Sequence, residues 1–342
     1  RARRLRPSEP RACHTVGMIS LLSRARGAMV GLAVGDALGT TNEFQSADTL
    51  SPITDMVGGG VFGLDPGQWT DDTSMALCLA DSLLAQGRYD SVDVMERYER
   101  WRREGYRSST GRCFDIGNQV SHALDAFDRE RRVPRGAPRS ASAGNGSIMR
   151  LAPVVIAGFP SRDSREIVAT AGLSARETHY SVEAEAATEV FAALLVGALL
   201  GWEPDRIVDV AWASTGSAFD DVAARVIGAD PATRASWEAS TSGYVIDGLR
   251  LAVHGLLDFS SFDEAVLALA NLGGDADTNA AIYGQLGGAF FGVEAIRPSW
   301  RDLIHDGDEI DALARDLIAL DLGEPRTRFD EDLPAGPVSA SA

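Results

Sequence analysis

The sequence predicts an all-α protein. Apolar residues recur at the three- and four-residue spacing of helices through most of the 342 residues, and no segment alternates convincingly as a half-buried strand does. Hydrophobic residues make up 45% of the chain and aromatic residues 7%, so a large core can be buried. No hinge-like linker interrupts the helical pattern. We therefore expect one large helical domain over residues 19–322.

The first predicted helix covers residues 19–39. Gly27, Gly31, Gly35 and Gly39 stand at every fourth position and so share one face. Each glycine costs a helix about 1 kcal/mol relative to alanine. A stripe of this kind therefore indicates that another helix packs closely against this face.

The second predicted helix covers residues 71–86, where Met75, Leu79 and Leu83 form an apolar face and Gly87 ends the helix. The same spacing predicts the remaining helices. They are expected at residues 91–104, 117–129, 164–174, 181–200, 204–213, 219–227, 243–257, 262–270, 278–291 and 309–319.

The two ends of the chain lack this pattern. Residues 1–18 are basic and contain proline without the apolar stretch of a signal peptide, and residues 323–342 mix proline, acids, serine and alanine. We expect both to be disordered extensions. No run of about 18 uncharged apolar residues is present, so no membrane span is expected.

Charge and cysteine content restrict the function further. A formal net charge of −17 argues against a nucleic-acid backbone as the main partner, because phosphate binding needs a concentrated basic surface. Cys13, Cys78 and Cys113 have no paired or metal-type spacing, which is typical of reduced thiols in a cytoplasmic protein. The five histidines form no zinc-binding pattern.

Two acidic clusters far apart in the chain carry most of the functional information. Residues 69–73 (Trp-Thr-Asp-Asp-Thr) and 273–278 (Gly-Gly-Asp-Ala-Asp-Thr) each place two carboxylates and threonine hydroxyls beside a helix start. These hard oxygen ligands suit Mg²⁺ or Mn²⁺ rather than zinc, and neither cluster could hold such an ion alone. The clusters therefore indicate two halves of one metal site. The alternative is that they cap their helices, because acids are favoured in a first turn.

A third motif follows an irregular loop predicted at residues 131–146, which are rich in Arg, Pro, Ser, Ala and Gly. Residues 145–150 combine a glycine turn with a helix start, a hydroxyl and an arginine. Backbone N–H groups in such a turn can bind phosphate. Asn-Gly is also among the commonest turn dipeptides, so an ordinary turn is the alternative.

These motifs together resemble the ADP-ribosylglycohydrolase family, particularly the bacterial branch that removes ADP-ribose from arginine of dinitrogenase reductase. The resemblance covers about residues 25–295. The motifs that carry it follow the family's order: residues 35–39 with Glu43 and Phe44, then residues 69–73, 113–118 and 144–150, then Thr178 with His179, and residues 273–278.

The resemblance implies an orthogonal multi-helix bundle with a binuclear Mg²⁺ or Mn²⁺ centre in an ADP-ribose cleft, so that residues 19–322 would form an ADP-ribosylglycohydrolase domain. Asp277 would bridge both ions, Glu43 would be a mobile acid over them, and Asp72 would serve catalysis together with these two. The residues that match the ligands of the first ion are Thr70, Asp71 and Asp72, and those of the second are Asp275, Asp277 and Thr278.

The resemblance also implies a substrate site. His179 would lie beside the substrate, although a single histidine at a helix start is more often a structural residue. The loop that matches the family's pyrophosphate loop comprises Gly144, Asn145, Gly146, Ser147, Met149 and Arg150. The expected partner is an ADP-ribosylated protein or a small molecule that contains ADP-ribose.

Asp115 bears on the choice of substrate and is a candidate catalytic residue. Its carboxylate could pair with a guanidinium, which favours arginine-linked ADP-ribose, or it could cap the helix that begins near Gly117. Serine, polymer and O-acetyl linkages are alternatives within the family. A binding or structural relative without turnover, like lens crystallins of this fold, and a two-metal phosphoesterase are the competing hypotheses.

Overall fold

The computed structural model describes residues 19–131, 133, 143–212, 217–227 and 229–326. Its first half contains α1 (Leu21–Gly39), α2 (Asp71–Gln86), β1 (Arg88–Asp90), α3 (Ser91–Glu104), α4 (Asn118–Glu130), η2 (Asn145–Ser147), α5 (Ala152–Gly158) and α6 (Ser164–Ala175). The second half contains α7 (Val182–Leu199), α8 (Pro204–Trp212), α9 (Ser217–Val226), α10 (Pro231–Ser236), η3 (Trp237–Ala239), α11 (Val245–Asp258), α12 (Phe262–Ala270), α13 (Ala276–Phe291), η4 (Val293–Ala295), α14 (Pro298–Leu303), α15 (Gly307–Ile318) and β2 (Gly323–Arg326).

The prediction of an all-α fold is confirmed, and each predicted helix is present with ends that agree within two residues. Three helices were missed, namely α5, α10 and α14. Each has at most seven residues and carries a proline in its first turn. A helix of that length makes too few turns for its apolar residues to repeat visibly.

The two short strands were also missed. Arg88–Asp90 and Gly323–Arg326 pair in parallel, and the N–H of Gly323 donates to the carbonyl of Gly87 at 2.7 Å. The expected loose C-terminal segment therefore begins with a strand. The rest of that segment, residues 327–342, and the expected N-terminal extension, residues 1–18, lie outside the described residues.

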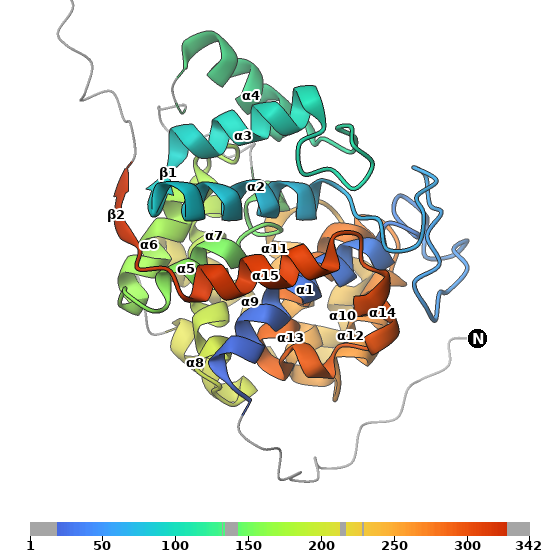
Figure 1. The fold of residues 1–342 in the computed structure, drawn as a ribbon. Coiled ribbons are helices and arrows are strands. Elements are labelled where there is room, and N and C mark those ends of the chain that lie inside the picture. Colours follow the sequence, from blue (N-terminus) through green and yellow to red (C-terminus); the bar gives the residue numbers. More distant parts are fainter. Residues whose placement is uncertain (1–18, 132, 134–142, 213–216, 228, 327–342) are drawn as a thin grey trace, which may run out of the picture.

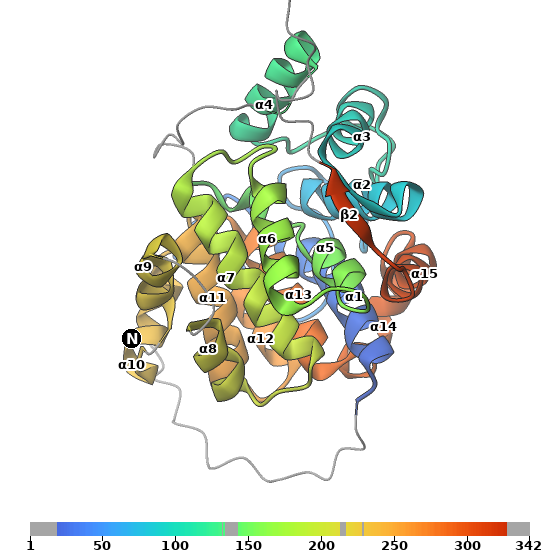
Figure 2. The ribbon, with the colours of Figure 1, turned by 90° about the vertical axis from the view of Figure 1, so that its left-hand side faces the viewer.

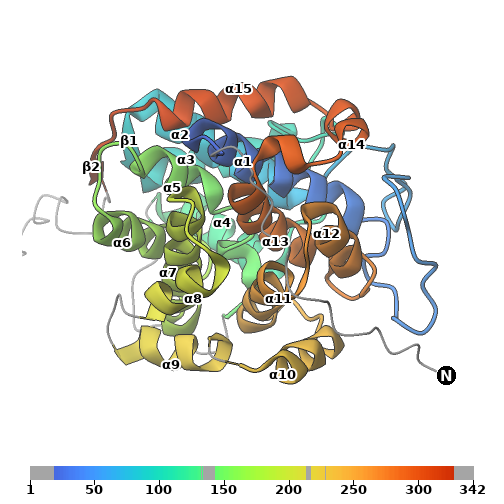
Figure 3. The same cartoon turned by 90° about the horizontal axis from the view of Figure 1, so that it is seen from below.

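Helices α1 and α13 lie side by side at the centre, with α15 against α1 and with α11 and α12 against α13 (Figure 3). Outside this centre, α7 contacts α6, α8 and α9 (Figure 2). Helix α2 packs on α3, and α3 in turn contacts α4 (Figure 1). Among the described residues, no helix is both long and apolar enough to cross a membrane.

The glycine stripe of α1 is the surface on which α13 packs, as predicted. A Cβ atom on Gly31 would lie 2.2 Å from the carbonyl oxygen of Gly284, and one on Gly35 would lie 2.2 Å from that of Ala280. At the end of the stripe, Gly39 meets the first turn of α13 at Ala276. The antiparallel contact therefore brings the C-terminal end of α1 beside the second acidic cluster.

Replacing Gly31 by alanine should destabilise the protein by about 1–3 kcal/mol, because two helix backbones would have to separate. This expected value is the net effect, after the roughly 1 kcal/mol that alanine contributes through its higher helix propensity. The urea midpoint of unfolding measures the effect. Gly117→Ala is the matched control, since a Cβ atom there would have no neighbour within 4 Å; equal midpoints for the two variants would contradict the packing explanation.

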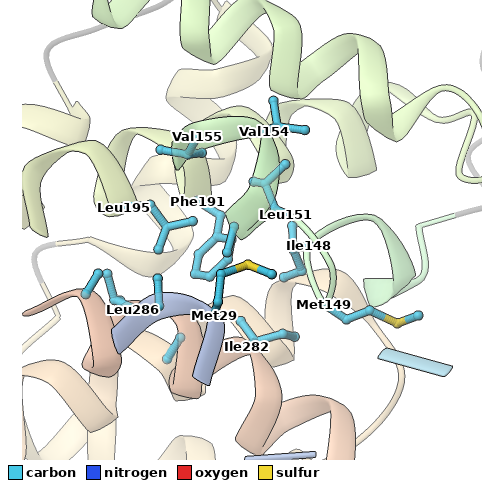
Figure 4. Close-up of a cluster of buried hydrophobic side chains, with 14 of the residues drawn as sticks. Met29, Ile148, Met149, Leu151, Val154, Val155, Phe191, Leu195, Ile282 and Leu286 are labelled. Atoms are coloured by element: carbon cyan, nitrogen blue, oxygen red, sulfur yellow. The ribbon is translucent and has the colours of Figure 1, made fainter. Parts of the chain in front are cut away.

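The apolar core extends from this central pair to the turn that precedes α5. Figure 4 shows Met29 of α1 and Ile282 of α13 near Ile148 and Leu151, together with Phe191 of α7. All five side chains are fully buried. The segment that contains the predicted phosphate loop is thus anchored in the core directly behind that loop.

Candidate active site

The first turn of α2 is held against α1 by Asp36. One carboxylate oxygen of Asp36 accepts hydrogen bonds from the backbone N–H and the hydroxyl of Thr70, at 2.8 and 2.9 Å. The other accepts from the N–H and the hydroxyl of Thr73, at 3.0 and 2.6 Å. Because α1 is fixed on α13, these bonds bring the start of α2 to the start of α13, and the two acidic clusters meet.

The same bonds determine what Asp36 and Thr70 can offer a cation. Carboxylate oxygens of Asp36, Asp72 and Asp277 lie within 4.8 Å of one another, which makes all three geometric candidates. An ionised carboxylate has about four acceptor positions, however, and those of Asp36 are already taken. The Thr70 hydroxyl donates most closely to Asp36, at 2.9 Å, and also lies 3.3 Å from Asp72 Oδ2 and 3.3 Å from Asp277 Oδ2. Asp36 is therefore already engaged by Thr70 and Thr73, which leaves Asp72 and Asp277 as the better candidates of this group.

Capping does not explain the acidic clusters. Thr70 and Asp275 stand at the N-cap positions of α2 and α13, and neither side chain makes a capping hydrogen bond. Asp72 Oδ1 and Asp277 Oδ1 are buried without a hydrogen-bond partner among the described residues. An unpaired buried carboxylate is costly, and a divalent cation is one group that could satisfy it.

The electrostatics agree with this interpretation. Burial, followed by the charges of neighbouring carboxylates, raises the pKa of Asp72 and of Asp277 well above the usual range. Asp71 is affected in the same way, with burial as the largest cause and Asp115 as the next. These residues could hold a metal ion, because a bound cation would favour the charged form of each.

A second acidic group lies at the wall of the cavity. Carboxylate oxygens of Glu43, Asp115 and Asp277 lie within 4.8 Å of one another. Glu43 is held there because the N–H of Phe44 donates to the carbonyl of Gly274 at 2.7 Å. Phe44 has a φ of 59°, an unfavourable value for a non-glycine residue that this tight contact maintains.

Burial is the main reason that the carboxyls of this second group are hard to ionise. It raises the pKa of Glu43 to about 9, with the charge of Asp115 as the next cause. It raises the pKa of Asp115 to about 7, with the charges of Asp36 and Asp275 as the next causes. Groups with such pKa values can hold or release a proton near neutral pH.

The capping alternative for Asp115 is wrong. Helix α4 begins at Asn118, its N-cap is Gly117, and no side chain caps it. Asp115 instead adopts a φ of 56° and lines the cavity.

The cavity has a volume of about 840 Å³, which suits a ligand of nucleotide size. The predicted site residues on its wall are Glu43, Asp71, Asp115, Gly144, Asn145, Gly146, Met149, His179, Asp275, Asp277 and Thr278. The remaining two predicted metal ligands, Thr70 and Asp72, are fully buried behind this wall.

The predicted phosphate loop is hydrogen-bonded to two segments of the cavity wall, at Gly243 and at Asp275. The N–H of Asn145 donates to the carbonyl of Gly243 at 3.0 Å. Its side-chain amide donates to Asp275 Oδ2 at 2.5 Å, which ties the loop to the acidic cluster. An isolated bridge between Gly144 and Tyr244 extends the first contact.

Two predicted substrate residues of this loop have a different role. Ser147 and Arg150 are each 1% exposed and do not line the cavity. Ser147 Oγ accepts a hydrogen bond from Thr188 at 2.9 Å, and Arg150 donates to the carbonyl of Gly146 at 2.7 Å. Both side chains therefore point into the protein and support the loop, so a contact of these two residues with substrate stays a prediction and would have to come from the backbone of the loop or from a rearrangement.

His179 lies at the cavity wall against the bare backbone of the loop. A Cβ atom on Gly146 would come within 2.5 Å of its Cε1, and one on Gly144 within 3.2 Å of its Nε2. A side chain at Gly146 would thus collide with the imidazole, whereas one at Gly144 would only crowd it. Burial, and then the positive charge of Arg150, lowers the pKa of His179 to about 3, so the ring is neutral.

Sequence reasoning missed two components of the site. Asp36 was noted only as part of a motif, although an acid within an otherwise small and apolar helix was a usable signal. Tyr244 and the preceding residues 241–243 line the cavity. They carry no spacing or composition that could have revealed this role.

Comparison with known proteins agrees with the geometry. The family model described as ADP-ribosylglycohydrolase matches residues 18–326. ADP-ribosylarginine hydrolase Tri1 of Pseudomonas putida is 40% identical over 312 residues, which cover 90% of this chain and 81% of that protein. ADP-ribosyl-[dinitrogen reductase] glycohydrolase of Rhodospirillum rubrum is 32% identical, covering 82% and 90%.

A solved structure titled ADP-ribosylglycohydrolase-related protein complex is also similar. It superimposes with a TM-score of 0.75 at 37% identity and covers 89% of this chain and 99% of that one. Fold, sequence and site thus agree, and the chain belongs to the ADP-ribosylglycohydrolase family.

Proposed function

We propose that this protein is a metal-dependent hydrolase that releases ADP-ribose from modified arginine side chains of proteins. The observation that carries the proposal is the meeting of Glu43, Asp115 and Asp277 at the wall of a cavity of about 840 Å³. The names of the relatives from Pseudomonas putida and Rhodospirillum rubrum, which act on ADP-ribosylarginine and on modified dinitrogen reductase, support this choice of substrate.

The donor set fits two divalent cations such as Mg²⁺ or Mn²⁺, because it contains only carboxylate and hydroxyl oxygens. Asp277 belongs to both groups of clustered carboxylates and is the residue placed to bridge them. Bound there, the ions would supply Lewis-acid chemistry to ribose hydroxyls or to a water. The residues that would hold them are Thr70, Asp71 and Asp72 on one side, and Asp275, Asp277 and Thr278 on the other.

The protein's own groups position the substrate and manage the proton. The loop at residues 144–146 and His179 would bind the pyrophosphate, which places the distal ribose toward the acids. With its pKa raised by burial, Glu43 can hold a proton near neutral pH and deliver it to the leaving nitrogen; in its charged form, which a bound cation would favour, it could instead take a proton from the attacking water. Asp115 lies beside it and would pair with the guanidinium of the arginine.

The decisive experiment offers the purified protein three substrates: ADP-ribosyl-arginine, a peptide ADP-ribosylated on serine, and free ADP-ribose. Release of ADP-ribose mainly from the arginine substrate is expected. Preferential cleavage of the serine peptide would replace the arginine assignment with another linkage. Release of AMP from ADP-ribose would indicate a pyrophosphatase, and no product from any substrate would indicate a binding protein.

Replacing Asp115 by asparagine should selectively impair the arginine substrate. The shape of the side chain is kept and its charge is lost, which costs roughly 1.5–3 kcal/mol, or about ten- to a hundredfold in kcat/KM. Hydrolysis of a neutral serine linkage should change much less. Asp125→Asn, on the exposed surface of α4, serves as the control. Equal small losses on both linkages would leave Asp115 without a role in specificity.

A further inference from the structure

The buried residues behind His179 form a chain of contacts that the proposed reaction does not use. Arg150 donates to Thr178 Oγ1 at 2.8 Å, and Thr178 Oγ1 lies 2.8 Å from His179 Nδ1. Arg150 is itself held by the carboxylate of Glu177, at 3.8 Å, and by the face of the Tyr98 ring, at 5.0 Å. All of these side chains are at least nine-tenths buried.

The direction of each hydrogen bond in this chain follows from the donors available. A guanidinium has no acceptor, so Thr178 Oγ1 must accept from Arg150. The single hydroxyl hydrogen of Thr178 then has one acceptor within reach among the described residues, His179 Nδ1. A neutral imidazole that accepts at Nδ1 carries its proton on Nε2.

The Nε2 edge of His179 is the one that lies at the loop. Nε2 is within 3.2 Å of the place that a Cβ atom on Gly144 would occupy, and within 2.8 Å of the corresponding place on Gly146. All three residues line the cavity. A proton fixed on Nε2 is therefore presented to a ligand that lies across this loop.

We infer that Thr178 and Arg150 are positioning residues that keep the proton of His179 on Nε2, so that this N–H donates to an oxygen of ADP-ribose bound against Gly144 and Gly146. The inference rests on the proposed function for the identity of the ligand. It assigns Arg150 a role different from a direct phosphate contact. Arg150 acts on His179 through Thr178. It also donates to the carbonyl of Gly146 and so holds the loop beside the imidazole.

The first test reads the tautomer directly and needs no substrate. Protein labelled with ¹⁵N-histidine gives distinct ring-nitrogen shifts for the two neutral tautomers, and the spectrum of His179→Gln identifies the signals of His179. We expect an acceptor-type shift at Nδ1 and a protonated shift at Nε2. A proton found on Nδ1, or on both nitrogens, in the wild-type protein at neutral pH would overturn the inference without any further variant.

The second test uses the matched variants Thr178→Val and Thr178→Ser. Valine keeps the shape and removes the hydroxyl, so the Nδ1 signal should shift or broaden. The dissociation constant for ADP-ribose, measured by calorimetry, should then rise about three- to tenfold, the value of one hydrogen bond. Serine keeps the hydroxyl and should restore both readouts. Unchanged Nδ1 shift and affinity in Thr178→Val would contradict the role of this chain.

Thr170→Val is the control for removal of a buried hydroxyl elsewhere, since among the described residues Thr170 Oγ1 bonds to its own helix, at the carbonyl of Glu166. It should leave the His179 signals and the ADP-ribose affinity unchanged; a similar loss in both valine variants would mean a general structural effect. In turnover assays the loss in Thr178→Val should be in KM rather than kcat. If ADP-ribosyl-arginine is not hydrolysed while the tautomer result holds, the proposed reaction fails and the positioning role stands.

Discussion

Replacing Asp277 by alanine should reduce turnover by more than about a hundredfold while the protein remains folded. Loss of a residue that only supports a metal ligand already lowers metal affinity or activity by up to about a hundredfold. Asp277 should matter more, because it belongs to both carboxylate groups. Its removal would open the coordination of both cations at once. Asp72→Ala should act in the same direction. The measurements are kcat/KM on ADP-ribosyl-arginine and bound metal by elemental analysis.

Stability provides the internal check on this prediction. Burial and neighbouring carboxylates raise the pKa of Asp277 well above its usual range, so its charge is unfavourable without a cation. Metal-free Asp277→Ala should therefore melt no lower than metal-free wild type at neutral pH. Asp302→Ala, which alters an exposed acid on α14, should match wild type in rate and metal content. A wild-type rate with normal metal content in Asp277→Ala would refute the two-metal site.

Removing divalent cations with EDTA should abolish activity, and Mg²⁺ or Mn²⁺ should restore it. Zinc should substitute poorly, because the donor set lacks the nitrogen and sulfur ligands that zinc prefers. The same cations should raise the Tm of the metal-free protein, and a concentration of one hundred times Kd should add about 2.7 kcal/mol of stability. Full activity of metal-free protein, or a Tm that does not respond to Mg²⁺, would contradict the prediction.

The stability of the metal-free protein should change with pH in a definite direction. In the folded protein the pKa of Glu43 is raised from 4.5 to about 9, and that of Asp115 from 3.8 to about 7. The folded state therefore holds protons that the unfolded state releases. The stability that these groups contribute is fully present below their unfolded values and is lost as pH rises through the folded ones.

Metal-free protein should accordingly melt at a lower temperature as the pH rises from about 5 to about 9, and the Tm gain from Mg²⁺ should increase over the same range. Scanning calorimetry with and without Mg²⁺ measures both trends. The Glu43→Gln variant is the control, because it cannot ionise at this position and should make the metal-free profile less steep, with the contribution of Asp115 remaining. A metal-free Tm that rises with pH would show that these carboxyls are not buried together.

Local pattern was sufficient for the longer helices because each one repeats apolar residues along its own length, whereas α5, α10 and α14 are too short to do so. Met75, Leu79 and Leu83 identify α2 without reference to any other part of the chain, and Gly87 ends it with a φ of 61°. The glycine stripe of α1 correctly indicated a close helix contact. It did not identify α13 as the partner, because the stripe specifies a distance of approach and not the surface that approaches.

The types of residue in the site were also visible in the sequence, but their orientation was not. Asn145, Ser147 and Arg150 occur in one short motif, yet Asn145 lines the cavity while Ser147 and Arg150 point into the protein. The 3₁₀ turn Asn145–Ser147 distributes its side chains around its axis, and Arg150 follows three residues after it. Which of them face inward depends on Thr188 and Thr178, which come from distant segments.

By itself, the sequence determined the all-α fold, the positions of the longer helices and the two clusters of hard oxygen ligands, since helical period and ligand chemistry are properties of short segments. The tertiary structure decided that Asp36 accepts hydrogen bonds from Thr70 and Thr73, and that Asp115 lies beside Glu43 instead of capping α4. The reason is physical: the role of a carboxylate is set by the donors and charges within a few ångströms of it. Here those neighbours come from helices that only the packing of α1 against α13 brings together.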